Sequence, residues 1–550
     1  NDYLSSYLHS GERIPERAPS FKNVYVVYPF SKYSGWKLKK LEFVGIKPTD
    51  LPRLIYPPHQ MDQEKMVVLQ TATFRSKLDE EAGKRVVSKR DFNAHRLLRA
   101  VDNNTLLSML PKSEEGSPND FIYPLDELLS LYIDHPYMIE NTERLLSSCS
   151  IHFDFAGENL NKNLSAYGKD AQADSAMLER LCKEGMPYRY KRPDEKILKR
   201  IRMELDVIKQ QGFMSYFLIN WDICQYARRK DYFYVGRGSG ANSVVAYLLR
   251  ITDVDPIELD LYFERFINLY RQNPPDFDID FSWRDREDIT DYIFNRFPHV
   301  ALLATYSTFQ FKAVVRELGK VLGIPPHEID HIQRAPYKDL DDVHKLVLRY
   351  GKYIEGFPNH LSIHAGGILI SEKPIHYYTA TDLPPKGFPT THFDMIVAED
   401  VGLYKFDILS QRGLGKIKDS LIEIERNHPD HPKIDIHDIA SLKKDERIKA
   451  ILREGKAIGC FYVESPAMRM LLKKLRVEEY LGLVAASSVI RPGVAKSGMM
   501  RQYILRFREP HRRNEAHPIL REIMPETYGV MVYQEDVIKV AHYFADLTLG

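Results

Sequence analysis

The chain has 550 residues, of which 44% are hydrophobic and 28% charged, and its formal net charge is +1. This length suits roughly three or four domains, and the composition is typical of a folded protein rather than a disordered or fibrous one. The near-zero charge excludes a globally basic nucleic-acid binder, so any basic surface must be local. No apolar run approaches the ~18 residues that a membrane-spanning helix needs, and we expect no membrane partner.

The four cysteines are spread along the chain without a CxxC pair: Cys149, Cys182, Cys224 and Cys460. This spacing argues against a zinc ribbon or a disulfide framework and fits a reducing compartment, so we expect a cytoplasmic protein. The chain begins at Asn1 without a methionine and stops at Gly550 directly after an apolar run. We therefore expect a piece of a longer protein.

The first 165 residues mix strand-like and helical runs, which predicts an α/β region. The strand-like runs are 24–28 and 66–70, and the helical runs are 94–101 and 125–132. Residues 171–211 are helical and basic, and Pro193-Asp194-Glu195 is a good helix start within them. Such a basic face is either simply solvated or contacts a nucleic-acid backbone, and both interpretations remain open.

A glycine-rich turn, Gly236-Arg237-Gly238-Ser239-Gly240, separates a strand-like run at 232–235 from an apolar helical run at 241–250. A strand, a glycine turn and a helix start together favour an anion site, because backbone N–H groups point outward and the helix dipole attracts negative charge. An ordinary tight turn is the alternative, since the turn matches neither the P-loop nor the dinucleotide fingerprint.

Alternating acids mark the segment Pro275-Asp276-Phe277-Asp278-Ile279-Asp280-Phe281. Period two places Asp276, Asp278 and Asp280 on one face of a strand and apolar residues on the other. Crowded carboxylates raise each other's pKa unless a cation lies between them, and such hard oxygen ligands suit Mg²⁺. A solvated polar face is the alternative. An EF-hand loop is not expected, because Phe281 stands where that loop requires glycine.

Two more segments could complete this site. Residues 402–409 place Lys405 and Asp407 on one strand face. They form either a surface ion pair or, if this strand lies beside the acidic one, a third carboxylate with a phosphate-binding lysine. Arg265, within Phe263-Glu264-Arg265-Phe266, is either structural or a clamp for a triphosphate.

Residues 301–362 are predicted to be mostly helical. Lys312 and Arg316 lie four residues apart and share a helix face. His360 and His364 also share a face, but the glutamate of a zinc-binding HExxH motif is absent, so zinc is not expected.

Eight short motifs occur in the order, and at nearly the spacing, of one known family. They are Gly236-Arg237-Gly238-Ser239-Gly240, Phe263-Glu264-Arg265-Phe266, Pro275 to Phe281, His364-Ala365-Gly366-Gly367, Lys405-Phe406-Asp407, Glu464-Ser465-Pro466, Arg491-Pro492-Gly493, and Tyr528-Gly529 through Tyr533-Gln534-Glu535. From about residue 60 onward, the chain resembles the α subunits of bacterial DNA polymerase III, the C-family replicative polymerases. Each motif is weak alone, and their common order makes the resemblance specific.

The resemblance implies an α+β multidomain fold. Its centre is a polymerase-β-like nucleotidyltransferase palm with a helical thumb and helical fingers, preceded by part of an α/β polymerase-and-histidinol-phosphatase (PHP) domain. The expected parts are the C-terminal part of the PHP domain at 1–165, the palm at 166–307 and 363–412, the thumb at 308–362, and incomplete fingers at 413–550.

The resemblance also implies a template-directed DNA polymerase that extends a primer 3′-OH by two-metal phosphoryl transfer. It assigns two Mg²⁺ ions to Asp276, Asp278 and Asp407, nucleotide binding to Gly238, Ser239, Arg265 and Lys405, and DNA binding to Lys312 and Arg316. Primer–template DNA and deoxynucleoside triphosphates (dNTPs) are the implied partners. A sliding clamp and other replicase subunits would bind through regions outside this chain.

The chain departs from the family pattern in its first part and near Met395. The histidine-containing metal motifs of the family would precede Asn1, and Thr71-Ala72-Thr73-Phe74 stands where metal-binding PHP domains carry Asn-Asp-x-His. The family often has a lysine directly after a Gln-Phe-Asp element, and here Met395 stands in that place, after His392-Phe393-Asp394. Two alternatives to a polymerase remain: a PHP-type metal-dependent phosphoesterase, and a non-catalytic DNA-binding scaffold derived from a polymerase.

Overall fold

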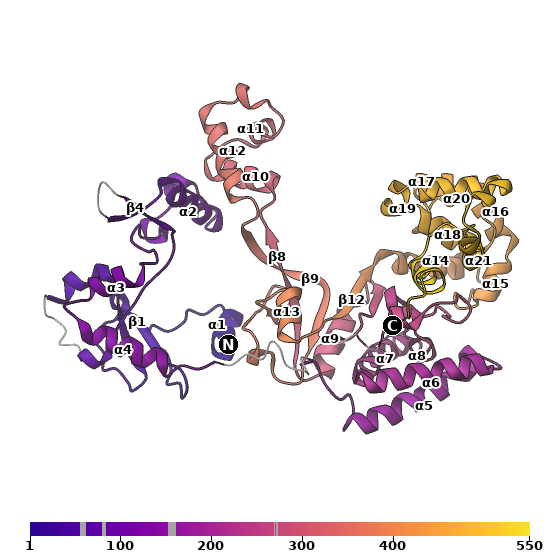
Figure 1. Cartoon of the computed structure of the whole chain (residues 1–550), viewed down its shortest axis with the longest axis horizontal. Coiled ribbons are helices and arrows are strands. Elements are labelled where there is room, and N and C mark those ends of the chain that lie inside the picture. The colour runs from indigo at the N-terminus through magenta and orange to yellow at the C-terminus, as the bar shows by residue number, and fades with distance from the viewer. Residues whose placement is uncertain (56–61, 80–83, 152–160, 269, 271–272, 550) are drawn as a thin grey trace. The chain divides into compact units, whose positions relative to one another are not determined.

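The computed structural model describes residues 1–550 except 56–61, 80–83, 152–160, 269, 271–272 and 550. The chain is mixed α/β and folds as two compact units (Figure 1). The larger unit comprises Asn1, Gly157–Ala304 and Ile363–Gly550, and the smaller unit comprises Asp2–Ala156 and Thr305–Ser362. Among the described helices, none combines the length and apolarity that crossing a bilayer requires.

The smaller unit contains a parallel three-stranded sheet, in the order β1-β2-β3, and a separate antiparallel pair, β4-β5. Its strands are β1 (Val26–Pro29), β2 (Glu42–Ile46), β3 (Met66–Val68), β4 (Ser76–Asp79) and β5 (Lys84–Val87). Its helices are α1 (Asp2–Ser10), α2 (Lys89–Asp102), α3 (Leu125–Leu131), α4 (Pro136–Ser147), α10 (Phe311–Val321), α11 (Pro326–Ile332) and α12 (Asp342–Ile354). The expected runs at 24–28, 66–70, 94–101 and 125–132 are confirmed as β1, β3, α2 and α3.

Two apolar cores hold the smaller unit together. One lies at the three-stranded sheet, where Val44 and Ile46 pack with Tyr132 and Met138, and the Tyr132 hydroxyl donates to the Ile46 carbonyl at 2.6 Å. The other joins α2 to α10, α11 and α12. Its fully or nearly buried side chains include Leu97, Val315, Leu318, Ile332, Val347 and Ile354. The amphipathic period of α10 buries one side and leaves the opposite side exposed.

The larger unit is built on a seven-stranded sheet in the order β10-β11-β8-β9-β12-β7-β6. Its strands are β6 (Tyr234–Arg237), β7 (Asp278–Ser282), β8 (Val300–Thr308), β9 (Pro358–Ile370), β10 (Thr381–Asp382), β11 (Thr390–Thr391) and β12 (Phe406–Gln411). The chain passes between the two units within β8 and β9. The strands β7 and β12 are parallel, while β6 and β9 flank them in the antiparallel direction.

Helices precede and interrupt this sheet: α5 (Ala171–Arg189), α6 (Glu195–Gln210), α7 (Met214–Arg229), α8 (Val244–Leu248), α9 (Arg286–Arg296) and α13 (Met395–Val401). The side chain of Asp194 accepts a hydrogen bond from the Ile197 backbone N–H at 2.9 Å, so the predicted helix start is confirmed. Apolar residues of α5 to α9 pack against those of β7 and β12 in one core. The sheet contributes Ile279, Phe281, Phe406 and Ile408 to it, and Phe277 joins them from just before β7.

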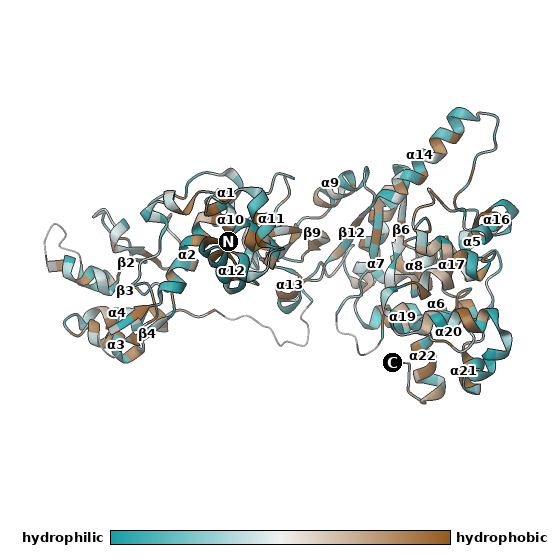
Figure 2. Ribbon diagram, turned by 90° about the horizontal axis from the view of Figure 1, so that it is seen from above, coloured by the Kyte–Doolittle hydropathy of each residue, from teal (hydrophilic) through white to brown (hydrophobic). Residues whose placement is uncertain are grey.

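The remainder of the larger unit is helical: α14 (Arg412–Asn427), α15 (Ile439–Lys444), α16 (Glu446–Glu454), α17 (Pro466–Leu475), α18 (Tyr480–Val489), α19 (Pro492–Lys496), α20 (Met499–Arg508), α21 (Pro518–Ile523) and α22 (Gln534–Lys539). Figure 2 shows hydrophilic and hydrophobic residues mixed along α14, which directly follows β12. A core of its own joins α17, α18 and α20.

Two sequence-based expectations about secondary structure are wrong in detail. The run at 241–250 is not one helix, because Ser243 has an extended backbone (φ −99°, ψ 123°) that separates a 3-10 turn at Gly238–Asn242 from the short α8. The region 301–362 contains α10 to α12 but begins and ends in strand, so His360 lies on β9 and not on a helix. In β8 and β9, long-range pairing in the sheet overrides the local periodicity of the sequence.

Candidate active site

The acidic strand and the Lys405–Asp407 strand lie side by side. In the parallel pairing of β7 with β12, Asp407 is the register partner of Asp278. The adjacency on which the candidate site depends is therefore confirmed. Asp276 lies just before β7, and its side chain is 55% exposed.

The alternation along β7 buries its apolar face as expected, but it does not leave all three acids open to solvent. Phe277 and Ile279 are buried, and Asp280 is only 4% exposed. The carboxylate of Asp280 is held by Arg237, whose Nε donates to Oδ2 at 2.7 Å. Its other oxygen, Oδ1, is buried and has no hydrogen-bond partner among the described residues.

Two basic side chains lie among the carboxylates. Arg237 also donates from a terminal nitrogen to Asp278 Oδ2 at 3.0 Å. Lys405 donates to Asp407 and lies 3.7 Å from Asp276 Oδ1. Sequence reasoning named Lys405 but gave Arg237 no role, although Arg237 stands inside the glycine motif. Its partnership follows from the antiparallel register of β6 and β7, which pairs Arg237 with Asp278.

The electrostatics of the cluster favour the binding of additional positive charge. Burial raises the pKa of Asp278 and neighbouring Asp407 raises it further, while Arg237 and Lys405 oppose this. Burial alone would lower the pKa of Lys405, but the hydrogen bond to Asp407 and the charges of Asp276 and Asp278 outweigh it, and the pKa is raised. The carboxylates thus hold Lys405 in its charged form.

The donor set fits a hard divalent cation, although the side chains do not converge on one. Within the described ranges, no three Asp, Glu, His or Cys side chains gather as metal ligands would. Asp276, Asp278 and Asp407 nevertheless offer carboxylate oxygens from adjacent segments, and Oδ1 of Asp280 receives no hydrogen bond from any residue that the structure describes. Carboxylate oxygens of this kind are the ligands that Mg²⁺ prefers.

The glycine turn faces the acidic strand. Gly238 has a left-handed backbone (φ +74°), and a Cβ atom built there would lie 2.9 Å from Oδ2 of Asp278. A Cβ atom at Gly240 would lie 2.4 Å from the ring of Phe277. Only glycine therefore allows this turn to approach the acidic strand so closely. Ser239, between the two glycines, is half-buried.

The expectation that a helix start completes an anion site is wrong. The first N–H groups of α8 are taken by Glu204 of α6, whose carboxylate accepts from the backbones of Val244 and Val245 at 3.1 Å each. The hydroxyl of Ser243 donates to the same carboxylate at 2.7 Å. A buried protein carboxylate already satisfies this helix end. Any phosphate contact in this segment is left to the glycine turn itself.

Arg265 lies on a 3-10 turn at Phe263–Arg265, and its side chain is 30% exposed. Its NH1 donates to Oε1 of Glu535 on α22 at 2.6 Å. The sequence places Glu535 in the motif Tyr533-Gln534-Glu535, but no local pattern links that motif to Arg265. The contact is a product of the tertiary fold.

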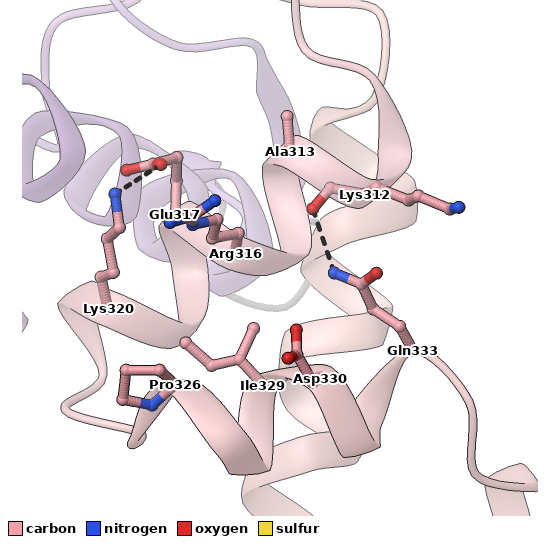
Figure 3. Close-up of a pocket in the computed structure, with 9 residues that line it drawn as sticks. All are labelled: Lys312, Ala313, Arg316, Glu317, Lys320, Pro326, Ile329, Asp330 and Gln333. Carbon is pink, nitrogen blue, oxygen red and sulfur yellow. Dashed lines mark hydrogen bonds and ion pairs between the residues drawn. The ribbon is translucent and has the colours of Figure 1, made fainter.

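Lys312 and Arg316 belong to the smaller unit, where they lie on the exposed side of α10. With Lys320 one turn further on, they line a cavity of about 620 Å³ between α10 and α11 (Figure 3). Acidic residues line it too, since Glu317 pairs with Lys320 at 2.7 Å and Asp330 comes from α11. Lys312 and Arg316 have no ion-pair partner within the described residues.

Comparison with known proteins identifies the family. Residues 176–410 match the model of the bacterial DNA polymerase III alpha NTPase domain, and residues 414–550 match that of the bacterial DNA polymerase III alpha subunit finger domain. The chain is 34% identical over 515 residues to DNA polymerase III subunit alpha of Bacillus subtilis, covering 86% of this chain and 44% of that protein. It is 32% identical over 486 residues to an error-prone DNA polymerase of Symbiobacterium thermophilum, covering 84% of this chain and 44% of the relative.

A third relative, DNA polymerase III subunit alpha of Borreliella burgdorferi, is 33% identical over 489 residues, covering 84% of this chain and 42% of its own length. The chain thus spans less than half the length of these relatives. The second family match lies within the larger unit, and the first covers parts of the larger unit together with Thr305–Ser362 of the smaller unit. The chain belongs to the bacterial DNA polymerase III alpha family.

Proposed function

We propose that this chain carries the catalytic centre of a template-directed DNA polymerase that serves chromosomal replication. The enzyme adds deoxynucleotides to a primer 3′-OH and releases pyrophosphate. The observation that carries the proposal is the parallel pairing of Asp278 with Asp407, with the turn at Gly238 facing the same acid. A scaffold that only binds DNA has no use for crowded, partly buried carboxylates, which cost stability.

Asp276, Asp278 and Asp407 would hold two Mg²⁺ ions. When bound, divalent cations supply Lewis-acid stabilisation of phosphoryl oxygens and of the attacking 3′-oxygen. Lys405, whose pKa is raised by the surrounding acids, keeps its charge beside Asp407 and is available to a phosphate.

The triphosphate of the incoming nucleotide would lie against Gly238 and Ser239, with Arg265 and Lys405 neutralising its charge. Fixed donors of this kind stabilise the charge that develops on the leaving pyrophosphate. Template pairing selects the base, so the protein itself needs only to hold backbones.

We assign the domains of the chain by its membership in the family. Residues 1–165 would form the end of a PHP domain, 166–307 and 363–412 the palm, 308–362 the thumb and 413–550 the fingers. Lys312 and Arg316 of the thumb would hold the primer–template backbone. The protein would act in the cytoplasm, with a sliding clamp and other replicase subunits as partners.

Primer extension with Mg²⁺ and dNTPs tests the proposal in the full-length natural protein. Asp278→Asn and Asp407→Asn should each lower incorporation by more than ~100-fold, since even indirect support of a metal site costs 10–100-fold. Affinity for primed DNA should stay nearly unchanged. Asp206→Asn, an exposed acid on α6, is the matched control and should extend normally. Near-normal extension by both Asp278→Asn and Asp407→Asn would reject the polymerase assignment.

A further inference from the structure

Helix α22 contacts both the Arg265 turn and the glycine turn of the proposed triphosphate site. Glu535 stands in its first turn with a side chain that is 13% exposed. Oε1 of Glu535 accepts from Arg265 NH1 at 2.6 Å and from Asn242 Nδ2 at 3.3 Å. One carboxylate oxygen therefore joins the turn that ends at Arg265 to the turn that begins at Gly238.

Asn242 extends this connection through further hydrogen bonds. Its side chain is 1% exposed, and its Nδ2 also donates to the Tyr262 carbonyl at 2.8 Å. Its own carbonyl accepts from Arg200 at 3.1 Å. Asn242, the last residue of the glycine turn, is therefore hydrogen-bonded both to the segment before Arg265 and to Glu535.

The position of Glu535 is fixed by α22 itself. The carboxylate of Asp536, 4% exposed, accepts from the backbone N–H groups of Val532 and Tyr533 at 2.8 and 2.9 Å and so closes the helix start. Further along the helix, Lys539 lies 3.0 Å from Asp260, just before the Arg265 turn. The Asp536 bonds therefore fix the helix start that carries Glu535, while the Lys539–Asp260 pair, with Asp260 65% exposed, contributes little.

We propose that Glu535 is a positioning residue for nucleotide binding, which holds the Arg265 guanidinium beside the glycine turn so that it meets the incoming triphosphate. This inference rests on the proposed polymerase function. Arginine offers five N–H donors in a rigid fork, and the contact of Arg265 with Glu535 uses NH1 alone. The partly exposed remainder of the fork can bind phosphate oxygens while Glu535 keeps the side chain in one rotamer, so the nucleotide does not bear that ordering cost.

A double-mutant cycle in the full-length natural protein tests this role. We expect Glu535→Ala to raise the KM for dNTP about tenfold, with kcat within about twofold, because ordering a long side chain costs roughly that factor in binding. Glu535→Gln keeps one acceptor oxygen and should restore part of the loss. In an Arg265→Ala background, Glu535→Ala should have no further effect, because the residue acts through Arg265.

Lys539→Met is the matched control, since it removes another ion pair of α22 without touching Arg265. It should leave the KM for dNTP unchanged, and all variants should keep the affinity for primed DNA of the wild type. An unchanged KM in Glu535→Ala, additive effects in the cycle, or an equal rise in KM in Lys539→Met would overturn the inference while leaving the polymerase standing. A wild-type protein that does not extend primers would overturn both.

Discussion

Arg237 lies against Asp280, with its Nε 2.7 Å from a carboxylate that is only 4% exposed. The same guanidinium reaches Asp278 at 3.0 Å, so one side chain from β6 compensates two acids of β7. A buried carboxylate left without a partner is costly, because it loses its hydration and gains nothing in return.

Replacing Arg237 should therefore destabilise the larger unit through Asp280. We expect Arg237→Gln to cost about 1–3 kcal/mol, toward the lower limit because the arginine side chain is 48% exposed. Adding Asp280→Asn removes the orphaned charge and should restore most of this loss. Thermal unfolding of the single and double variants measures the effect.

The control for this pair is Arg284→Gln, which breaks the exposed Arg284–Asp419 ion pair at 2.8 Å. It should change stability by less than ~1 kcal/mol. If Arg237→Gln is equally mild, or if Asp280→Asn makes it worse, the carboxylate of Asp280 does not depend on Arg237.

The glycine turn should tolerate no side chain at Gly238. Alanine there adopts a left-handed backbone and also meets Asp278 Oδ2 at 2.9 Å. Gly212 is the matched control. Its backbone is left-handed like that of Gly238 (φ +70° compared with +74°), but a Cβ atom there would meet nothing within 4 Å. Both alanine variants should lose about 1–2 kcal/mol from backbone strain. Only Gly238→Ala should also lower primer extension severalfold, and equal activity of the two variants would contradict a close approach of this turn to the acids.

The basic side of α10 should contribute to DNA binding as point charges. Residues four apart on a helix are separated by about 6 Å along its axis, which lets Lys312 and Arg316 contact neighbouring phosphates of one strand. Lys312→Ala and Arg316→Ala should each weaken binding of primed DNA and each reduce the slope of log Kd against log salt by about one. The comparison variant is Lys338→Ala, an exposed lysine of the same unit outside the cavity. A slope equal to the wild-type value in both α10 variants would exclude these contacts.

His95 should make the smaller unit sensitive to acid. Its Nε2 accepts from the Gly116 backbone N–H at 2.8 Å, which requires the neutral ring. Burial, with the nearby charge of Arg99, lowers its pKa below the ordinary 6.5. Below pH 6.5 the His95 ring therefore binds a proton in the unfolded chain but stays neutral in the folded one. The contribution of neutral His95 to stability is complete above pH 6.5 and is lost as the pH falls toward the folded pKa.

Thermal unfolding of wild type and His95→Gln between pH 8 and pH 5 checks this sign. The glutamine side chain can still accept from Gly116 but does not titrate, so wild type should lose stability relative to the variant below pH 6.5, by at most about 1.4 kcal/mol per pH unit. A pH-independent difference between wild type and His95→Gln would show that the ring is not held neutral.

The amino-acid sequence by itself determined the local features of this protein. Period-two alternation predicted the strands that carry Asp278 and Asp407, and Asp194 marked a helix start, because these depend on residues a few positions apart. The ordered motifs likewise pointed to the family. Local periodicity failed where distant partners intervene, at the short α8 and at the strands β8 and β9.

Only the tertiary structure decided which of these features meet. The register that sets Asp407 beside Asp278, the guanidinium of Arg237 over the acids, and the reach of Glu535 to Arg265 all join segments far apart in the chain. The same is true of Glu204, which occupies the helix start that looked open to a phosphate. Strand pairing and side-chain packing are long-range, and no short window of residues encodes the partner that a buried charge will find.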